Sequence, residues 1–312
     1  MAKKTDQDPA GQRVSRTRTS RKLQQRLALA EKEILRSFRA VPRTRRTEAV
    51  ISNRQVVYDY DLTPEQQEDL QIGIRDTLDE SLETTGMFVP LLWWYKPEVE
   101  QPYRQGTLEE LNRFNVLIGS AIALGLVGLD RLPPQVIAPE VLLSSQPYLE
   151  SLRSVYVQNY GTIKSLSNRT ADQVIQRINA GLSAGNSPTD IAKEIRGRFD
   201  VSDSNAKRIA NTEINRAYNN GKMDAVELAA KESGLRAGVI HISALLQTTR
   251  KTHAKRHGKA FTVEEQRSWW DSGSNRIQCK CTTRSILLDS KGRVVQREEQ
   301  QEITDQGLAF FN

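Results

Sequence analysis

The segment "SDSNAKRIANTEINRAYNNGKMDAVELAAKESG", residues 202–234, decides the fold because its residues predict a helix with two different faces. Apolar residues recur at helical spacing on one side: Ile209, Ile214, Ala217 and Tyr218. Polar residues follow at intervals of four, three and four on another side: Arg208, Thr212, Asn215 and Asn219. The spacing predicts a helix that buries its apolar face and offers its polar face to a neighbouring element.

Two further helices are predicted just before this segment, within residues 169–199. The first ends at the glycine-bearing "GLSAGN" of residues 181–186. The second begins with Ser187 as its cap, followed by Pro188 in the first turn and Asp190 at the capping-box position.

The pattern changes to strands after Gly234. "AGVIHISALLQ", residues 237–247, is a strand candidate, and "CKCTTRSILLDSKGRVVQ", residues 279–296, predicts two short strands around a turn at residues 290–292. We therefore predict an α+β protein, with a predominantly helical N-terminal part followed by a domain of helices and a small antiparallel sheet.

The first half of the chain is predicted to be helical with a proline-rich connector. A helix starts with Thr63 as cap and Pro64 in its first turn. The connector of residues 87–103 contains Trp93, Trp94 and three prolines, which we expect to prevent a continuous helix. "DRLPPQ", residues 130–135, is a predicted boundary. The expected divisions are a basic arm (1–46), a helical domain (47–145), a helix-and-sheet domain (146–288), and a C-terminal hairpin strand and tail (289–312).

The basic charge of the chain is concentrated at its N-terminus. Residues 1–46 hold 14 Lys and Arg against 4 Asp and Glu, an excess of 10, whereas the whole chain has a net charge of +7. Residues 1–20 are predicted to be disordered, and residues 21–38 to form an amphipathic helix. The arm is either a solvated tail or a surface for DNA phosphates. The candidate DNA-binding residues are Lys3, Lys4, Arg13, Arg16, Arg18, Arg21, Lys22, Arg43, Arg45 and Arg46.

Composition indicates the cellular compartment in which the protein is expected. The longest apolar segment, residues 114–129, is short and carries polar residues and glycines, so we expect no membrane span. The N-terminal basic residues precede no apolar core, so we expect no secretion signal. The chain has 2 cysteines, one residue apart, which cannot join distant segments. A reducing, cytoplasmic setting fits this composition.

A candidate metal site lies in "THAKRHGKAFTVEEQRSWWDSGSNRIQCKC", residues 252–281. The segment combines an H-x3-H pair with a C-x-C pair, and imidazole and thiolate groups are good zinc ligands. The candidate ligands are His253, His257, Cys279 and Cys281. Three interpretations stay open: a structural zinc site, a hydrogen-bonded core without metal, and a catalytic metal. His241, in the middle of a predicted strand, is expected to be an ordinary core or surface histidine.

The order of these motifs resembles the head-morphogenesis, or minor head protein, family of tailed phages, typified by phage Mu protein F. Four features in order carry the resemblance, over roughly residues 146–288: "GLSAGNSPTDIAKEI", "RIANTEINRAYNNG", the Arg-x-x-His of "RKTHAKRHG", and "QCKC" leading into a strand. The resemblance implies a protein of the virion head, present in the host cytoplasm during assembly. It implies association with a portal protein and with procapsid or scaffold components, and a role in head assembly, DNA packaging or DNA ejection.

Two other functions remain as alternatives. One is a metal-dependent nuclease or hydrolase that uses His253, His257 and Glu213, and the other is a non-specific double-stranded-DNA-binding module that uses the arm. Glu213 near arginines is either a general base or part of a structural polar network. The predicted members of that network are Arg208, Thr212, Glu213, Asn215 and Arg250. We expect a structural rather than an enzymatic protein.

Overall fold

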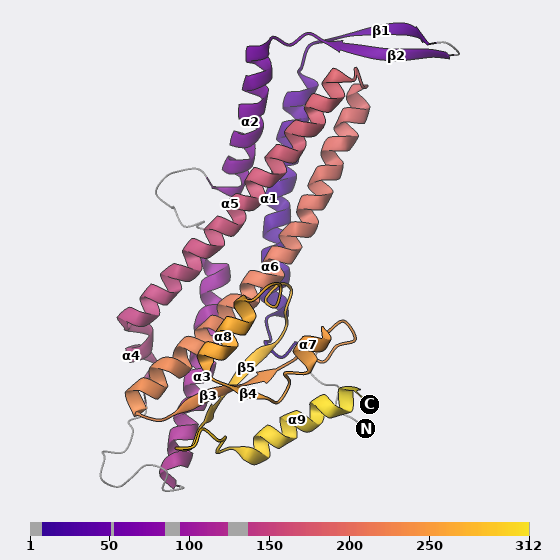
Figure 1. Ribbon diagram of the computed structural model, residues 1–312. Coiled ribbons are helices and arrows are strands. Elements are labelled where there is room, and N and C mark those ends of the chain that lie inside the picture. Colours follow the sequence, from indigo (N-terminus) through magenta and orange to yellow (C-terminus); the bar gives the residue numbers. More distant parts are fainter. Residues whose placement is uncertain (1–7, 51–52, 85–93, 124–136, 312) are drawn as a thin grey trace. The chain divides into compact units, whose positions relative to one another are not determined.

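A computed structural model describes residues 8–50, 53–84, 94–123 and 137–311 (Figure 1). The helices are α1 (Arg13–Arg39), α2 (Pro64–Leu82), α3 (Lys96–Ala123), α4 (Pro139–Ser144), α5 (Gln146–Ser183), α6 (Pro188–Ser233), α7 (Lys251–Ala254), α8 (Val263–Asp271) and α9 (Arg297–Phe311). The strands are β1 (Arg43–Val50), β2 (Asn53–Tyr60), β3 (Ala237–Ile242), β4 (Ala260–Phe261) and β5 (Thr282–Leu287). This mainly helical structure with two small antiparallel sheets confirms the predicted α+β class.

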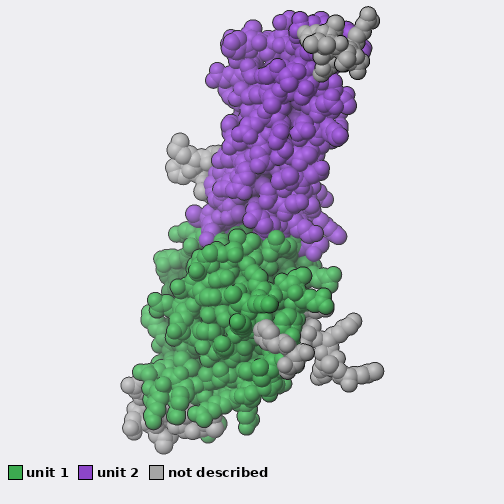
Figure 2. Space-filling model, turned by 45° about the vertical axis from the view of Figure 1, so that its right-hand side comes forward, with its two compact units in different colours: residues 1–16, 96–156, 211–312 green, residues 17–95, 157–210 purple. Residues whose placement is uncertain are grey.

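The described part of the chain divides into two compact units, which Figure 2 colours separately. One unit contains residues 1–16, 96–156 and 211–312, and the other contains residues 17–95 and 157–210. This division differs from the expected one because each unit gathers separate chain segments. The chain passes from one unit to the other four times: within α1, α5 and α6, and directly before α3.

The sheet of the first unit has the strand order β4-β3-β5, with both pairs antiparallel. His241 of β3 pairs with Thr283 of β5 in this register. Val239, Trp270, Cys281 and Leu287 pack with α3 and α6 side chains in one buried cluster, and Ile240, Ile286 and Ile303 of α9 form another. The first cluster lies against the α3 and α6 helices, and the second lies against α9.

The α6 helix is longer than the sequence pattern predicts. Its start is as predicted, since Ser187 Oγ accepts a hydrogen bond from the Asp190 backbone N–H at 3.1 Å. The predicted break near residue 200 is wrong, because α6 continues through it. Ser202 and Ser204, which resemble cap residues, instead donate to the carbonyl oxygens of Arg198 and Asp200 one turn earlier.

The N-terminal arm is more ordered than predicted. Helix α1 begins at Arg13, so the prediction of disorder up to residue 20 is wrong over residues 13–20. Leu23, Leu27, Ile34 and Phe38 of α1 are completely or almost completely buried. The arm is therefore part of the folded core, and its removal would expose that core.

The β1 and β2 strands form an antiparallel hairpin that the sequence analysis did not predict. Its register pairs Arg43 with Tyr60 and Arg45 with Tyr58. The Tyr58 backbone N–H donates to the Gly185 carbonyl at 3.0 Å, which attaches the hairpin to the turn between α5 and α6.

Three further predictions can be compared with the described residues. The capping box at Thr63 is confirmed. The expectation that prolines prevent a helix over residues 87–103 is wrong from residue 96, because Pro102 lies inside α3. The predicted C-terminal hairpin is reduced to one bridge, Leu288 with Val294, and is followed by α9 instead of a tail. Lys3, Lys4, Trp93 and the proline pair of "DRLPPQ" lie outside the described residues. None of the described helices is long and apolar enough to cross a membrane.

Two glycines allow the α3 and α6 backbones to touch. A Cβ atom on Gly106 would lie 2.1 Å from the Tyr218 carbonyl oxygen, and one on Gly221 would lie 2.1 Å from the Tyr103 carbonyl oxygen. These distances are too short for any side chain. The reciprocal contact fixes how closely α3 approaches α6.

We predict that Gly221→Ala lowers the free energy of unfolding by about 1–3 kcal/mol or more, because the added methyl group forces two backbones apart. Gly119→Ala, in an exposed turn of α3 with open space around it, is the matched control and should raise stability by up to about 1 kcal/mol. Thermal and denaturant unfolding measure both changes. Equal effects of the two substitutions would contradict the close contact.

Candidate functional site

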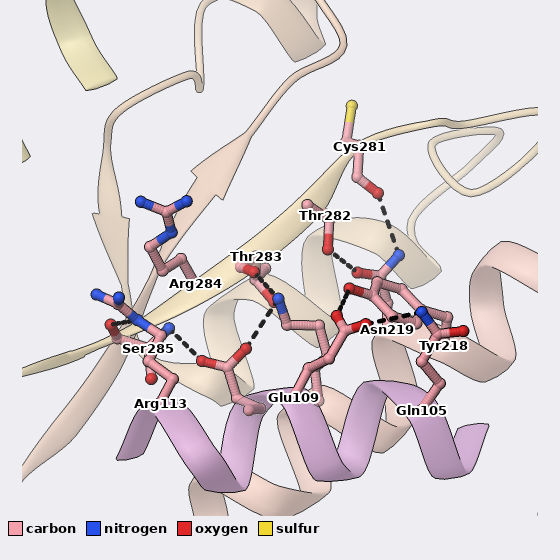
Figure 3. A network of polar contacts seen from close by, with 12 residues as sticks. Gln105, Glu109, Arg113, Tyr218, Asn219, Cys281, Thr282, Thr283, Arg284 and Ser285 are labelled. Carbon is pink, nitrogen blue, oxygen red and sulfur yellow. Dashed lines mark hydrogen bonds and ion pairs between the residues drawn. The ribbon is translucent and has the colours of Figure 1, made fainter. Parts of the chain in front are cut away.

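A row of α6 side chains faces the outer edge of β5 and the C-x-C segment before it (Figure 3). Asn215 Nδ2 donates to the carbonyl oxygens of Cys279 and Cys281 at 2.8 and 3.1 Å. Asn219 Nδ2 donates to the Cys281 carbonyl at 3.1 Å, and its Oδ1 accepts from the Thr282 hydroxyl at 2.9 Å. These contacts give the edge strand hydrogen-bond partners that a neighbouring strand would otherwise provide.

Lys222 and Glu110 provide further hydrogen-bond partners for the outer edge of β5. Lys222 Nζ donates to the Thr283 carbonyl and lies 2.8 Å from Glu110 Oε2. The other Glu110 oxygen accepts from the Ser285 N–H at 2.6 Å, while Arg113 Nε donates to the Ser285 carbonyl at 3.1 Å. Glu110 and Lys222 are 1% and 8% exposed, so this ion pair is internal. Helices α3 and α6 together hold the strand.

Two other predicted residues hold the loop that leads to the cysteines. Thr212 Oγ1 accepts a hydrogen bond from the backbone N–H of Gln278, which has a left-handed φ of 52°. Arg250 donates to the carbonyl oxygens of Ser274, Asn275 and Ile277 at 2.6, 3.0 and 3.0 Å. Residues 274–278 are thus fixed by side chains from both α6 and the start of α7.

The remaining predicted members of the polar network lie elsewhere. Arg208 bonds Asn205 on its own helix at 3.1 Å. Glu213 is buried, and its carboxylate accepts from Arg216 at 3.1 and 3.2 Å. Burial raises the pKa of Glu213 above its ordinary value of 4.5, although Arg216 and Arg276 oppose this. Because the folded-state pKa of Glu213 lies above its unfolded-state pKa, protonation of this carboxyl favours the folded state. The contribution to the free energy of unfolding is fully present below the unfolded-state pKa and is lost as pH rises through the folded-state pKa.

A buried cluster of imidazole and thiol groups lies on the other side of the C-x-C segment. His253 Nδ1 is 3.4 Å from Cys281 Sγ and 3.5 Å from Cys279 Sγ. His241, His253 and Cys281 each offer a ligand atom within 4.8 Å of the others, so these three residues can hold a metal ion. This grouping contains no carboxylate, and Glu213 is not part of it.

The electrostatics of the cluster follow from its burial. Burial, assisted by the nearby Arg256 guanidinium, lowers the pKa of His241 to about 3, so its ring is neutral at neutral pH. A hydrogen bond from Cys281 and the neighbouring His253 lower the pKa of Cys279. The same hydrogen bond, together with burial, raises the pKa of Cys281.

His257 is not a member of the group of three residues that can hold a metal ion. Its Nδ1 accepts a hydrogen bond from the Ser243 N–H at 3.0 Å, and its ring lies against Gly307 of α9. Burial lowers the pKa of His257, opposed by hydrogen bonds to the backbone of Ile303 and Ser243. His241, which the sequence analysis expected to be an ordinary core or surface histidine, is buried beside His253 instead.

The candidate DNA-binding residues differ in exposure. Arg16 is 5% exposed and is held by Asp8 at 2.8 Å and Asn215 at 3.4 Å, so it is not available on the surface. Lys22 is half-buried. The exposed members of the set in the described residues are Arg13, Arg18, Arg21, Arg43, Arg45 and Arg46.

Sequence reasoning missed three residues of the site: Lys222, Glu110 and His241. Lys222 follows Asn219 by three residues and continues the spacing of the polar face, so the pattern contained a signal for it. Glu110 and His241 come from α3 and β3, and no local spacing connects either of them with the cysteines.

Comparison with known proteins identifies the segment that contains this site. Residues 172–284 match the family model of phage Mu protein F-like proteins. This segment is phage Mu protein F-like. It comprises the end of α5, all of α6, the histidines, the C-x-C pair and the first half of β5.

The phage Mu protein F-like segment covers about a third of the chain. The chain is also similar to the NAD(+)–arginine ADP-ribosyltransferase EFV of Enterococcus faecalis, at 26% identity over 184 residues. The similarity covers 55% of this chain and 38% of that protein, so the chain spans well under half of that protein's length. No solved structure shows a significant match.

We predict that Lys222→Met lowers the free energy of unfolding by about 3–5 kcal/mol, because Glu110 then stays buried without its cation. The double variant Lys222→Met/Glu110→Gln should recover part of this loss, since it leaves no uncompensated charge. Lys231→Met, at an exposed position of the same helix, should change stability by less than about 0.5 kcal/mol. A denaturant-based double-mutant cycle measures the coupling, and a double variant as unstable as the sum of the single ones would argue against the pair.

Proposed function

We propose that this chain is a minor head protein of a phage, associated with the portal and acting in head assembly, DNA packaging or DNA ejection. The observation that carries the proposal is the family match over residues 172–284. The matched segment contains the side chains of α6 that hold β5, together with the C-x-C segment and the first half of β5. The proposed localisation is the virion head, with the host cytoplasm as the place of assembly.

The site supports a structural rather than a catalytic role for this segment. Its polar side chains bond backbone groups of the same protein, as Asn215, Asn219 and Arg250 do. Glu213 is bound by Arg216 and is buried, which does not suit a general base that must reach a substrate proton. We propose that the metal of the His and Cys cluster is zinc and that it is structural, because thiolate and imidazole ligands favour this ion.

The portal protein and procapsid components are the proposed partners. We predict that the chain co-purifies with its cognate portal protein when the two are co-expressed. It should enter procapsids assembled from major capsid protein, scaffold and portal, but not procapsids assembled without the portal. Quantitative mass spectrometry of purified particles measures the incorporation. Equal incorporation with and without the portal would contradict portal association, and absence from both particles would contradict the head-protein proposal.

Double-stranded DNA is a second proposed partner, through exposed arginines of α1 and β1. Deleting residues 1–46 is not a clean test because α1 contributes buried side chains to the core. We predict instead that replacing Arg18, Arg21, Arg43 and Arg45 with Gln weakens DNA binding. The slope of log affinity against log salt should fall by roughly 0.9 for each DNA phosphate that the variant no longer neutralises.

Replacing Lys32 and Arg36 with Gln is the control for this DNA test, since both residues are exposed on α1 but lie outside the predicted set. Fluorescence anisotropy with a labelled duplex at several salt concentrations measures the slopes. If the control and the four-residue variant change the slope equally, the predicted arginines do not form the specific DNA-binding surface.

A further inference from the structure

The four groups of the buried cluster come from three separate parts of the first unit. His241 lies in β3, His253 in α7, and Cys279 and Cys281 directly before β5. Their exposed fractions are 0%, 2%, 6% and 2%, respectively, so water does not compete for them. A buried set of two imidazoles and two thiols matches a common ligand set of structural zinc sites.

Two of the distances within the cluster agree with tetrahedral coordination. Zinc bonds of about 2.0–2.1 Å to nitrogen and about 2.3 Å to sulfur place neighbouring ligand atoms roughly 3.3–3.8 Å apart. The two distances from His253 Nδ1 to the sulfurs, 3.4 and 3.5 Å, lie in this range. His241 also offers a ligand atom within 4.8 Å of those of His253 and Cys281. Cys279 Sγ does not belong to this group of three, so binding of one ion by all four residues requires His241 and Cys279 to move closer together.

A chain of hydrogen bonds orients His241 as a ligand. Arg256 donates to Gln266 Oε1 at 3.2 Å, so this amide oxygen is an acceptor on the side that faces His241. His241 Nδ1 lies 3.3 Å from the same oxygen and must therefore carry a proton. The other ring nitrogen, Nε2, then has a lone pair, and this buried atom has no hydrogen-bond partner among the residues that the structure describes. Metal-bound histidines are commonly held in this way through their second nitrogen.

His257 does not have a comparable arrangement. Its Nδ1 lone pair already accepts the hydrogen bond from Ser243, and its ring packs against α9. The H-x3-H spacing suggested that His253 and His257 share a helical face. However, α7 ends at Ala254, so His257 lies beyond the helix.

We propose that His241, His253, Cys279 and Cys281 bind one zinc ion, with His241 taking the place that the sequence spacing assigned to His257. This ligand set rests on the proposed zinc but is independent of any role in a phage head. Four protein ligands leave no open position for a substrate, so the ion connects β3, α7 and the C-x-C segment. The ion joins the two ends of the segment between His253 and Cys279, which contains Trp269. The ring centroid of Trp269 lies 5.3 Å from that of His241 and 4.8 Å from that of His253.

Metal content and cobalt spectroscopy of the full-length protein test this proposal. Wild type and His257→Gln should each contain about one zinc per chain, and replacement by Co²⁺ should give thiolate-to-cobalt charge-transfer bands and the intense visible bands of tetrahedral cobalt. His241→Gln should lose stoichiometric zinc or bind it 10- to 100-fold more weakly. Wild-type protein without stoichiometric metal would overturn the zinc proposal and leave a hydrogen-bonded clasp or a disulfide as the explanation.

A second pair of variants keeps the ligand assignment testable if His241→Gln does not fold. His241→Cys should retain the metal and increase the cobalt charge-transfer intensity by about half, because a third thiolate joins two. His257→Cys should leave that intensity unchanged. If instead His257→Cys increases the charge-transfer intensity and His257→Gln loses its zinc, then His257 is the fourth ligand, as the sequence spacing suggested. Portal co-purification has no part in these measurements, so failure of either proposal can be recognised separately.

Discussion

The arrangement of the first unit depends on the outer edge of β5 receiving its hydrogen bonds from side chains. A strand at the edge of a sheet has backbone groups that need partners, and burial makes an unpaired group costly. Here Asn215, Asn219 and Lys222 donate to its carbonyl groups or to those of the C-x-C segment, and Glu110 accepts from one of its amides. The strand can therefore be buried at the edge of a three-stranded sheet. The positions of both cysteines follow, because Asn215 holds their carbonyl oxygens.

This arrangement requires α3 and α6 to lie unusually close together. Gly106 and Gly221 remove the side chains that would separate the two helices, and Glu110 and Lys222 lie about one turn or less further along the same helices. Their ion pair is buried, where replacing one partner is much more costly than it would be on the surface. The hydrogen bonding of the strand thus depends on the close packing of the two helices. The phage Mu protein F-like match includes α6 and the first half of β5, but it does not include α3.

The sequence predicted features that depend on local spacing. The caps at Thr63 and Ser187, the start of the strand predicted over residues 237–247 and the polar face of α6 all have signals within a few residues of one another. Features that depend on distant contacts were missed or were wrong. The sequence pattern predicted a break near residue 200, yet α6 continues through it and Ser202 bonds back to the Arg198 carbonyl. His257 has helical spacing from His253, but the helix ends before reaching it. His241 joins the cluster only because β3 pairs with β5, which no local pattern reveals.

Hydrogen exchange at the outer edge of β5 tests the central claim most directly. The amide of Ser285 faces away from β3 and is bonded to Glu110. If the side chains of α3 and α6 hold this edge, residue-resolved exchange should show that the Ser285 amide opens with a free energy close to that of global unfolding. This opening free energy should equal that of the Arg284 and Ile286 amides, which face β3. Fast exchange at Ser285, with protection retained at Arg284 and Ile286, would show that the edge is open and would contradict the account.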